Sequence, residues 1–315
     1  MKGIQISKII YRVAKFSGLL GAVGASLLFA TPSAQAISVT QSDDATALAN
    51  TLIGTGITLV GTPNLSGASI QSGTFTGGAT DVGISSGIVL SSGNVNNISG
   101  TNLNGGATES VGIGNEFDDD YSTDVGTPGD VDLNALSGFS TFDASILEFD
   151  FQFSDGSVGG DLFFNFVFAS EEYVDFIGSE FNDVFGFFVD DNNVALVPGT
   201  STPITINTIN NISNSAFYVN NVANTDGIPV AGRDVLFDGM TTVITAQALA
   251  LGIGVHTMKF AVADASDGIL DAGVFLQGGS FSSGQPSVIP VPAAVWLFGS
   301  ALVGLFGFGK RRKTV

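Results

Sequence analysis

The sequence predicts an all-β protein, a β-sandwich with a jelly-roll-like arrangement, carrying one helical segment at each end of the chain. Three observations predict this class. Short runs of alternating apolar and polar residues recur between residues 37 and 281. Turn-forming residues separate these runs, with Gly alone supplying 42 of the 315 residues. Helical periodicity is convincing only near the two termini, so the middle is expected to fold as one large β domain.

The clearest strand is Leu147–Phe153, in which every second residue is apolar. Because side chains alternate across a strand, this run places its large apolar groups on one face. The other expected strands are Gly56–Val60, Gln71–Phe75, Gly87–Leu90, Leu162–Phe168, Asp183–Val189, Ile204–Asn207, Thr241–Ala246, Thr257–Ala263 and Gly273–Phe281. Short helical turns are expected at Ala45–Thr51 and Asp132–Leu136. Most of the 26 Phe residues are expected to pack in the core.

The composition excludes several function classes. The absence of Cys from the sequence excludes disulfides, thiolate metal sites and a Cys nucleophile. A single His, His256, excludes a metal site with several His ligands and disfavours a Ser-His-Asp triad, so His256 is expected to be a structural residue. The formal net charge of −19 makes nucleic acid a poor partner, because binding phosphate requires a basic face.

The charge is distributed unevenly along the chain. All 29 acidic residues lie between Asp43 and Asp271, and only Arg233 and Lys259 are basic within that stretch. The remaining basic residues lie in segments 2–15 and 310–313. Targeting signals at both ends of an acidic cargo would produce this pattern.

Residues 1–36 are predicted to be a secretory signal peptide. A basic segment precedes the apolar run 17–30, a Pro follows it, and Ala34 and Ala36 form the small-x-small pattern of a cleavage site. The expected partners are the Sec translocon and a signal peptidase, which would cut after Ala36. The alternative is an uncleaved membrane anchor, although the apolar run is short for a span.

Residues 286–315 are predicted to be a sorting and anchoring segment. Residues 293–309 carry no charge and approach the lower length limit of a membrane-spanning helix. Trp296 suits the outer interface, and Arg311 and Arg312 belong to a basic cluster expected on the cytoplasmic side. Pro290, Val291 and Pro292 precede the helix and force an extended backbone there.

This tail resembles the PEP-CTERM sorting signal of Gram-negative bacteria, in which a Pro-x-Pro motif, a short apolar helix and a terminal basic cluster follow one another. Val291 departs from the Glu found at the middle position of that motif. The resemblance implies that an exosortase recognises and cleaves the chain near Pro290–Pro292. A plain C-terminal tail anchor is the alternative.

Acidic residues also gather in three loop-like places, which begin near Asn115, Ser170 and Asp264. Carboxylate and Asn oxygens are ligands that Ca²⁺ prefers, and weak sites can fill outside the cell. Ca²⁺ is therefore the candidate cofactor, and no other is expected. The candidate ligands are Glu171, Glu172, Asn182, Asp183, Asp264, Asp267 and Asp271. The alternative is that these acids are solvated turn residues.

A catalytic role is not expected. Glu171 and Asp183 would be the paired carboxylates of a secreted carbohydrate-active hydrolase, the alternative function. Such pairs are frequent by chance in a chain with 29 acidic residues, and no basic or His partner is evident beside this one.

The middle of the chain resembles the choice-of-anchor L domains. The motifs that carry the resemblance are Gly129–Leu133, Leu147–Phe151, Phe166–Tyr173, Phe181–Phe188, Ala195–Thr200, Asp264–Asp271 and Val274–Leu276. Ala272-Gly273 stands where a Ser-Ala-like pair would be expected. The resemblance runs over most of residues 50–281, within a domain expected at residues 37–285. It implies an extracellular module joined to a surface anchor, without an assigned reaction.

These motifs predict where the candidate ligands meet. Phe166 and Phe168 on one strand, and Phe185 and Phe187 on another, should point inward. If these two strands pair, the acids that follow the first and precede the second meet at one rim of the sandwich, near residues 264–271. The rim would hold Ca²⁺, or a hydroxyl-rich glycan with Tyr173 as a stacking face.

The predicted function is that of an exported bacterial surface or extracellular-matrix protein with a structural or adhesive role in envelope, exopolysaccharide or biofilm. It would be held briefly in the inner membrane with a cytoplasmic C-terminus and then reach the cell surface or the medium. Extracellular polysaccharide is the expected binding partner. A permanently membrane-tethered binding module is a further alternative.

Overall fold

The computed structural model describes residues 36–100, 121–156, 158–222 and 230–285. The signal segment up to residue 35 with Ala34, the acidic residues 116–120 and the whole of 286–315 lie outside the described residues. The predicted sorting motif at Pro290, Val291 and Pro292, and the predicted anchor with Trp296, Arg311 and Arg312, therefore stay predictions. Within the described ranges, no helix has the length and apolarity needed to span a bilayer.

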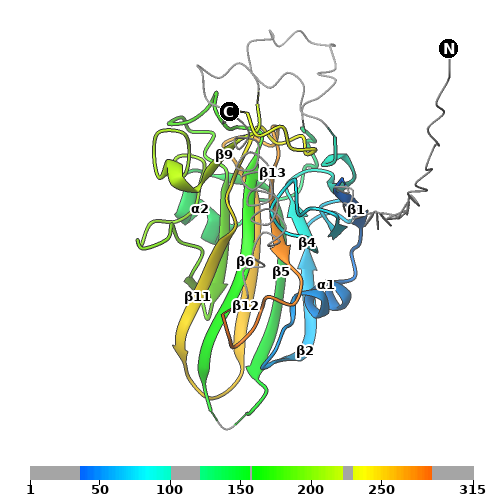
Figure 1. Cartoon of the computed structure of the whole chain (residues 1–315), viewed down its shortest axis with the longest axis vertical. Helices are drawn as coiled ribbons and strands as arrows, with labels where there is room; N and C mark the ends of the chain where they lie inside the picture. Colours follow the sequence, from blue (N-terminus) through cyan, green and yellow to red (C-terminus); the bar gives the residue numbers. More distant parts are fainter. Residues whose placement is uncertain (1–35, 101–120, 157, 223–229, 286–315) are drawn as a thin grey trace, which may run out of the picture. The chain divides into compact units, whose positions relative to one another are not determined.

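The described residues form two antiparallel β-sheets (Figure 1). The eight-stranded sheet has the order β1 (Ser38–Gln41), β3 (Ser72–Thr76), β4 (Ser86–Ser91), β13 (Ala272–Gln277), β6 (Gly160–Ser170), β10 (Gly239–Thr241) and β9 (Tyr218–Asn220), and β11 (Ile244–Leu251) also pairs with β6. The five-stranded sheet has the order β2 (Ile57–Ser66), β5 (Thr141–Phe153), β12 (His256–Ala265), β7 (Val184–Val189) and β8 (Asn192–Asn193). The expectation of a β-sandwich is confirmed.

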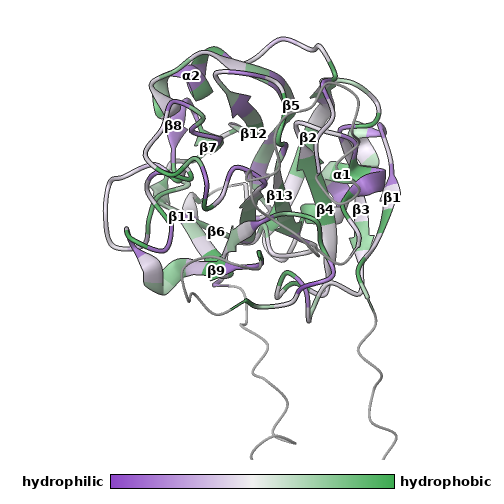
Figure 2. Cartoon of the chain, turned by 90° about the horizontal axis from the view of Figure 1, so that it is seen from above, coloured by the Kyte–Doolittle hydropathy of each residue, from purple (hydrophilic) through white to green (hydrophobic). Residues whose placement is uncertain are grey.

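The chain crosses between the sheets repeatedly. β4, β5, β6 and β7 alternate between them, and so do β11, β12 and β13. The order β4-β13-β6-β11 therefore faces the order β5-β12-β7-β8, the strand arrangement of a jelly roll. Figure 2 shows the two layers end-on, with α1 (Ala45–Leu52) lying beside β2 and β4.

Two short helices begin and end on local signals. The Asp44 side chain caps the first helix by accepting a hydrogen bond from the Ala47 backbone N–H at 3.0 Å. The second helix, α2 (Val131–Ser137), is capped by Asp130 and ends at Gly138, whose φ of 82° is readily available only to Gly. Short 3₁₀ turns occupy Val95–Asn97 and Ser215–Phe217. Both helical expectations, at Ala45–Thr51 and Asp132–Leu136, are confirmed.

The main core lies between the sheets and is rich in Phe. Phe187 stacks on Phe260 with ring centroids 4.7 Å apart, and Phe166 meets Phe185 at 5.1 Å. Phe168 is also fully buried in this core. The inward orientation predicted for these aromatic residues is confirmed.

The outer faces of both sheets are also covered. Val167 and Ala169 in β6 pack outside the eight-stranded sheet with Phe237 and Phe275. On the other side, Leu133 of α2 packs against the outer face of the five-stranded sheet. Strands β6 and β7 are therefore buried on both faces, which explains why their sequences are more continuously apolar than an ordinary alternating pattern.

One predicted strand is wrong and another is divided. Ile204–Asn207 contributes only an isolated bridge from Thr205, because Thr208 folds the chain into a turn by donating to the Pro203 carbonyl at 2.8 Å. The run Thr241–Ala246 is split between β10 and β11.

Candidate functional site

The candidate site is one end of the sandwich, where β4, β6 and β12 end and β5, β7 and β13 begin. The register fixes this meeting, because Ala272 pairs with Ser170 and Gly273 pairs with Ser91. In the other sheet, Ala263 pairs with Val184. We call the acidic side chains gathered here the acidic rim: Glu171, Glu172, Asp183, Asp264, Asp267 and Asp271.

The strands that bring the rim acids together are not hydrogen-bonded neighbours. β6 and β7 do not pair with each other; they lie in opposite sheets and face each other through their Phe side chains. The acids still meet, because the ends of facing strands lie at the same end of a sandwich. The Ser170 hydroxyl donates to Asp183 Oδ2 at 2.8 Å, and the Ala265 N–H donates to Asp183 Oδ1 at 3.1 Å.

Asp264 and Asp271 are completely buried, each with an exposed fraction of 0%. Asp264 Oδ1 accepts hydrogen bonds from the Ser92 hydroxyl at 2.5 Å and the Ala272 N–H at 3.1 Å. Asp264 Oδ2 and both Asp271 oxygens have no hydrogen-bond partner of ordinary geometry among the described residues. Glu172, 1% exposed, leaves its Oε2 in the same condition. Unpartnered buried carboxylate oxygens are rare because they are costly.

Burial and mutual repulsion raise the pKa values of the rim acids. Burial and then the charge of Asp183 raise the pKa of Glu172 to about 10. Burial also raises the pKa of Asp183 to about 8, against hydrogen bonds from Ser170 and Ala265. The pKa of Asp271 is raised to about 8 by burial and then by Asp183, although Thr123 lies close enough to oppose part of the rise. Burial, Asp183 and Asp271 together raise the pKa of Asp264 well above its usual range.

Gly93 makes room for Asp271. A Cβ atom at this position would overlap the Asp271 carboxylate, Oδ2 above all. The Asp271 carboxylate therefore lies directly against the backbone that follows β4, next to Ser92, the partner of Asp264. The two carboxylates therefore lie against the same short stretch of backbone, Ser92 and Gly93.

The predicted ligands do not all converge. Glu171 Oε2 accepts from the Asp238 N–H at 3.2 Å. Asn182 acts as a structural bridge, donating to the Ser137 carbonyl and accepting from the Asn207 N–H. Asp267 is only half-buried. Across the described ranges, no three His, Cys, Asp or Glu side chains are arranged together as ligands of one metal ion. The prediction of one site built from all the candidates is not supported by this arrangement.

The prediction that Tyr173 offers a stacking face for a glycan is wrong. Its side chain is fully buried and packs against Tyr218, with ring centroids 5.0 Å apart. Gly239 allows this close packing, because a Cβ there would lie 2.7 Å from Tyr173 carbons. The residue is part of the core.

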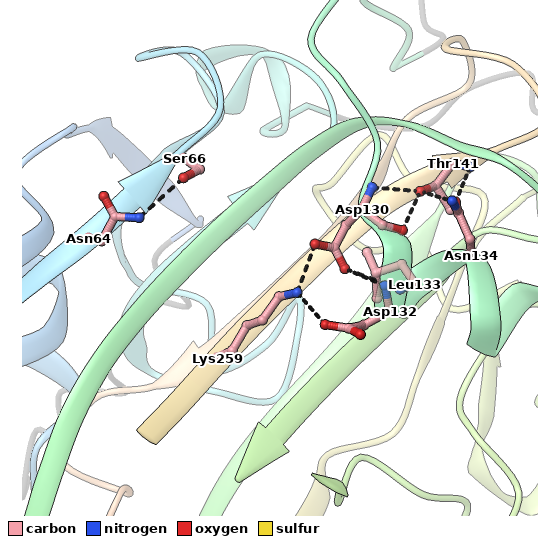
Figure 3. Close-up of polar contacts among 8 residues, drawn as sticks. All are labelled: Asn64, Ser66, Asp130, Asp132, Leu133, Asn134, Thr141 and Lys259. Carbon is pink, nitrogen blue, oxygen red and sulfur yellow. Dashed lines mark hydrogen bonds and ion pairs between the residues drawn. The ribbon is translucent and has the colours of Figure 1, made fainter. Parts of the chain in front are cut away.

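A second acidic site was missed by the sequence reasoning (Figure 3). Lys259 Nζ on β12 lies 2.7 Å from Asp130 Oδ2 and 2.7 Å from Asp132 Oδ2 at the start of α2. The Lys259 ammonium also lies 5.4 Å from the centre of the Phe188 ring. The isolation of Lys259 in an acidic stretch was the signal available in the sequence.

Asp143 was also missed. This residue is buried near the start of β5, with a φ of 51°. Its carboxylate accepts hydrogen bonds from the backbone N–H groups of Val125 and Thr127. Asp143 therefore fastens a loop beside the rim, and its charge adds to the rise in the pKa of Asp271.

His256 is a structural residue, as predicted. Its Nδ1 lies 2.7 Å from Asp190 Oδ2, and its Nε2 lies 3.0 Å from the Gly252 carbonyl oxygen. Partial burial lowers its pKa, but the contacts with Asp190 and Gly252 outweigh this and raise the pKa overall. The two ring nitrogens therefore hold the β7–β8 turn, through Asp190, and the β11–β12 connection, through Gly252.

The fold and the rim define a class of protein: an antiparallel two-sheet sandwich that gathers buried carboxylates at one end. The family model of the Choice-of-anchor L domain matches residues 37–282, so the chain belongs to this family. Membership indicates a surface-associated or exported protein. No curated protein and no solved structure matches the chain.

Proposed function

We propose that this chain is an exported bacterial surface or extracellular-matrix protein, whose sandwich has a structural or adhesive role. The observation that carries the proposal is the family match over residues 37–282. That region lies between two segments with the character of targeting signals, one ending at Ala36 and one containing Pro290 and Pro292. An exosortase-like enzyme is the processing partner we propose.

The build of the sandwich supports a binding or structural role. Its sheets are covered on both faces by apolar side chains, so a large core stabilises the domain without disulfides. Its acidic, hydroxyl-rich and amide-rich composition suits a hydrated matrix of polysaccharide. Extracellular polysaccharide remains the partner class we propose, bound by exposed polar side chains and not by the buried Tyr173.

The hydrolase alternative receives no support from the rim. Glu171 is 5% exposed and Asp183 is 1% exposed, and Asp183 is held by donors from Ser170 and Ala265. A glycosidase needs both carboxylates to reach the scissile bond from opposite sides. Buried carboxylates do not offer that access.

The test is to determine both termini of the mature protein and its cellular fraction by mass spectrometry. We expect a chain that begins at Ile37, ends before Trp296 and is recovered from the surface or medium. Recovery of a Trp296 peptide from the mature protein would favour the permanently tethered module. A cytosolic chain that retains Met1 and Val315 would refute export altogether.

A matched pair of variants tests the sorting motif. Replacing Pro290 and Pro292 by Ala should leave the full-length tail attached and hold the protein at the inner membrane. Pro286→Ala, a substitution outside the motif, should be processed normally. If both variants are processed alike, the Pro-x-Pro motif is not the recognition element.

A further inference from the structure

We propose that the carboxylates of Asp264 and Asp271 bind one divalent metal ion of the Ca²⁺ class at the acidic rim. The inference does not depend on how the chain is sorted, so it and the proposed function can fail separately. It begins with the oxygen atoms that the protein leaves without partners.

The unpartnered atoms point to a ligand. Asp271 is fully buried with neither oxygen hydrogen-bonded in ordinary geometry, and Asp264 Oδ2 shares this condition. An ionised carboxylate that is buried without a partner strongly destabilises the folded state, as does the removal of one partner of a buried ion pair. Two such groups in one pocket also repel each other. A bound cation would remove both penalties.

The protein has little positive charge with which to neutralise this pair. The basic residues in the acidic stretch are Arg233 and Lys259. Lys259 is paired with Asp130 and Asp132, and Arg233 Nη1 donates to the Thr80 carbonyl. Among the described residues no cation is therefore left for Asp264 and Asp271, so protons or a bound cation would supply the compensating charge.

Two features favour a metal ion of the Ca²⁺ class. The two carboxylates and the neighbouring Ser92 hydroxyl supply oxygen atoms, the ligand type that Ca²⁺ prefers. Ca²⁺ accepts several oxygen ligands in irregular geometry, whereas Mg²⁺ retains its waters and demands an octahedron. Gly93 also lies directly against the Asp271 carboxylate, which any Cβ at this position would displace. Gly93 thus allows the Asp271 carboxylate to stay beside Asp264, which is the position that binding one metal ion between them requires.

Glu172 and Asp183 extend the negative potential beside this pair without being required as ligands. Asp183 is satisfied by two donors and raises the pKa of Asp264, Asp271 and Glu172. Of the candidate ligands predicted from the sequence, only Asp264 and Asp271 are therefore proposed to bind the ion. The arrangement agrees with the finding that no three acidic side chains of the described residues form a ligand set, because the remaining ligands would be neutral oxygens.

The test measures thermal unfolding of the full chain in mild detergent at neutral pH, with EDTA, with Ca²⁺ and with Mg²⁺. We expect Ca²⁺ at about a hundred times its Kd to raise the Tm by about 5 °C or more. The shift should disappear in Asp264→Asn and Asp271→Asn. The matched control is Asp132→Asn, which removes a carboxylate at the Lys259 site and should keep the full Ca²⁺ shift.

A second measurement keeps the inference testable if a variant folds poorly. Tb³⁺ bound between Asp264 and Asp271 would lie near Tyr121, since the Asp271 N–H donates to the Tyr121 carbonyl at 2.9 Å. We expect Tb³⁺ emission on tyrosine excitation, competition by Ca²⁺, loss in Asp271→Asn and a weaker signal in Tyr121→Phe, which retains both carboxylates.

Three results would overturn the inference. Absence of both a Ca²⁺ shift and Tb³⁺ emission in the unsubstituted chain would mean that protons neutralise the pair. A Ca²⁺ shift that survives in both Asn variants would place the ion elsewhere. An equal response to Mg²⁺ would refute the Ca²⁺ class.

Discussion

Two groups of acidic side chains in this sandwich differ in how their charge is compensated. At the start of α2, Asp130 and Asp132 share the ammonium group of Lys259, at 2.7 Å from each. At the rim, Asp264 and Asp271 are more deeply buried, yet three of their four carboxylate oxygens have no hydrogen-bond partner of ordinary geometry among the described residues, and Thr123 only approaches Asp271. The protein supplies its own cation at the first site. At the second, it depends on protons or ions from its surroundings, which links stability to the medium.

The largest expected effect is a dependence of stability on pH that comes from the rim and not from the Lys259 site. The raised pKa values at the rim, about 8 for Asp183 and Asp271 and about 10 for Glu172, mean that the folded state holds protons that the unfolded chain releases. This contribution is fully present below the unfolded pKa near ~4 and is lost as the pH rises through the folded pKa values.

In EDTA, we therefore expect the free energy of unfolding to fall between about pH 4 and about pH 10, which is the range from the unfolded pKa values to the highest folded one. Each unit by which a folded pKa exceeds the unfolded one contributes about 1.4 kcal/mol to this loss, so three groups that are each shifted by at least one unit give about 4 kcal/mol or more. Urea unfolding at several pH values measures it. Ca²⁺ should flatten the decline, and Asp132→Asn should leave it unchanged. A stability that rises with pH over this range would contradict the account of the rim.

The next effect comes from removing the cation that the protein supplies. Lys259→Met keeps the stem of the side chain over Phe188 but leaves Asp130 and Asp132 without their shared partner. Asp130 is mostly buried, so we expect a loss of about 2–3 kcal/mol, somewhat below the range for a fully buried pair. Denaturant unfolding at neutral pH checks the value. Lys259→Arg should restore part of the stability, and equal stability of Met and wild type would show that the ion pair contributes nothing.

A smaller loss of stability is expected when a side chain is introduced at Gly93, against the Asp271 carboxylate. Gly93→Ala forces the Asp271 carboxylate to move, which is a case of overpacking with a penalty of about 1–3 kcal/mol. The loss should be greater in Ca²⁺ than in EDTA, because the displaced carboxylate can no longer bind the ion. Gly252→Ala is a useful control, since a Cβ there meets no atom within 4 Å. An equal loss of stability in both buffers would show that the close packing at Gly93 does not contribute to ion binding.

The smallest expected effect on stability comes from removing the more exposed of the two carboxylates that pair with Lys259. Asp132 is 51% exposed in its side chain, and Asp130 retains the ion pair when Asp132 is replaced. Asp132→Asn should therefore reduce stability by only about 0.3–1 kcal/mol, the range for exposed pairs. High salt should reduce this difference. A loss as large as that of Lys259→Met would mean that Asp132, not Asp130, is the main partner.

Much of the fold could be predicted from local pattern. The alternation in Leu147–Phe153 identified the inward face of β5, and Phe166, Phe168, Phe185 and Phe187 were assigned correctly to the core. The strand at Ile204–Asn207 was wrong, because its backbone is held by threonine side chains in a turn. Alternation reports which face of a segment is apolar, but not which neighbour satisfies its backbone.

The candidate site was predicted in place but not in detail. The acids after β6, before β7 and around residues 264–271 do meet at one rim. The expectation was conditional on β6 pairing with β7, whereas the two strands lie in different sheets, and Tyr173 proved to be buried. Which carboxylates have partners depends on donors far apart in the sequence, such as Ser92 for Asp264.

The sequence by itself determined that this is an acidic, Cys-free, Phe-rich β protein of the Choice-of-anchor L family, because composition, alternation and ordered motifs are properties of the chain. Only the tertiary structure decided that Lys259 neutralises Asp130 and Asp132 while Asp264 and Asp271 are buried against the backbone at Gly93. The physical reason is that the free energy of a carboxylate is set by its burial and by the groups around it in space, and the sheet register brings those groups together from distant parts of the chain.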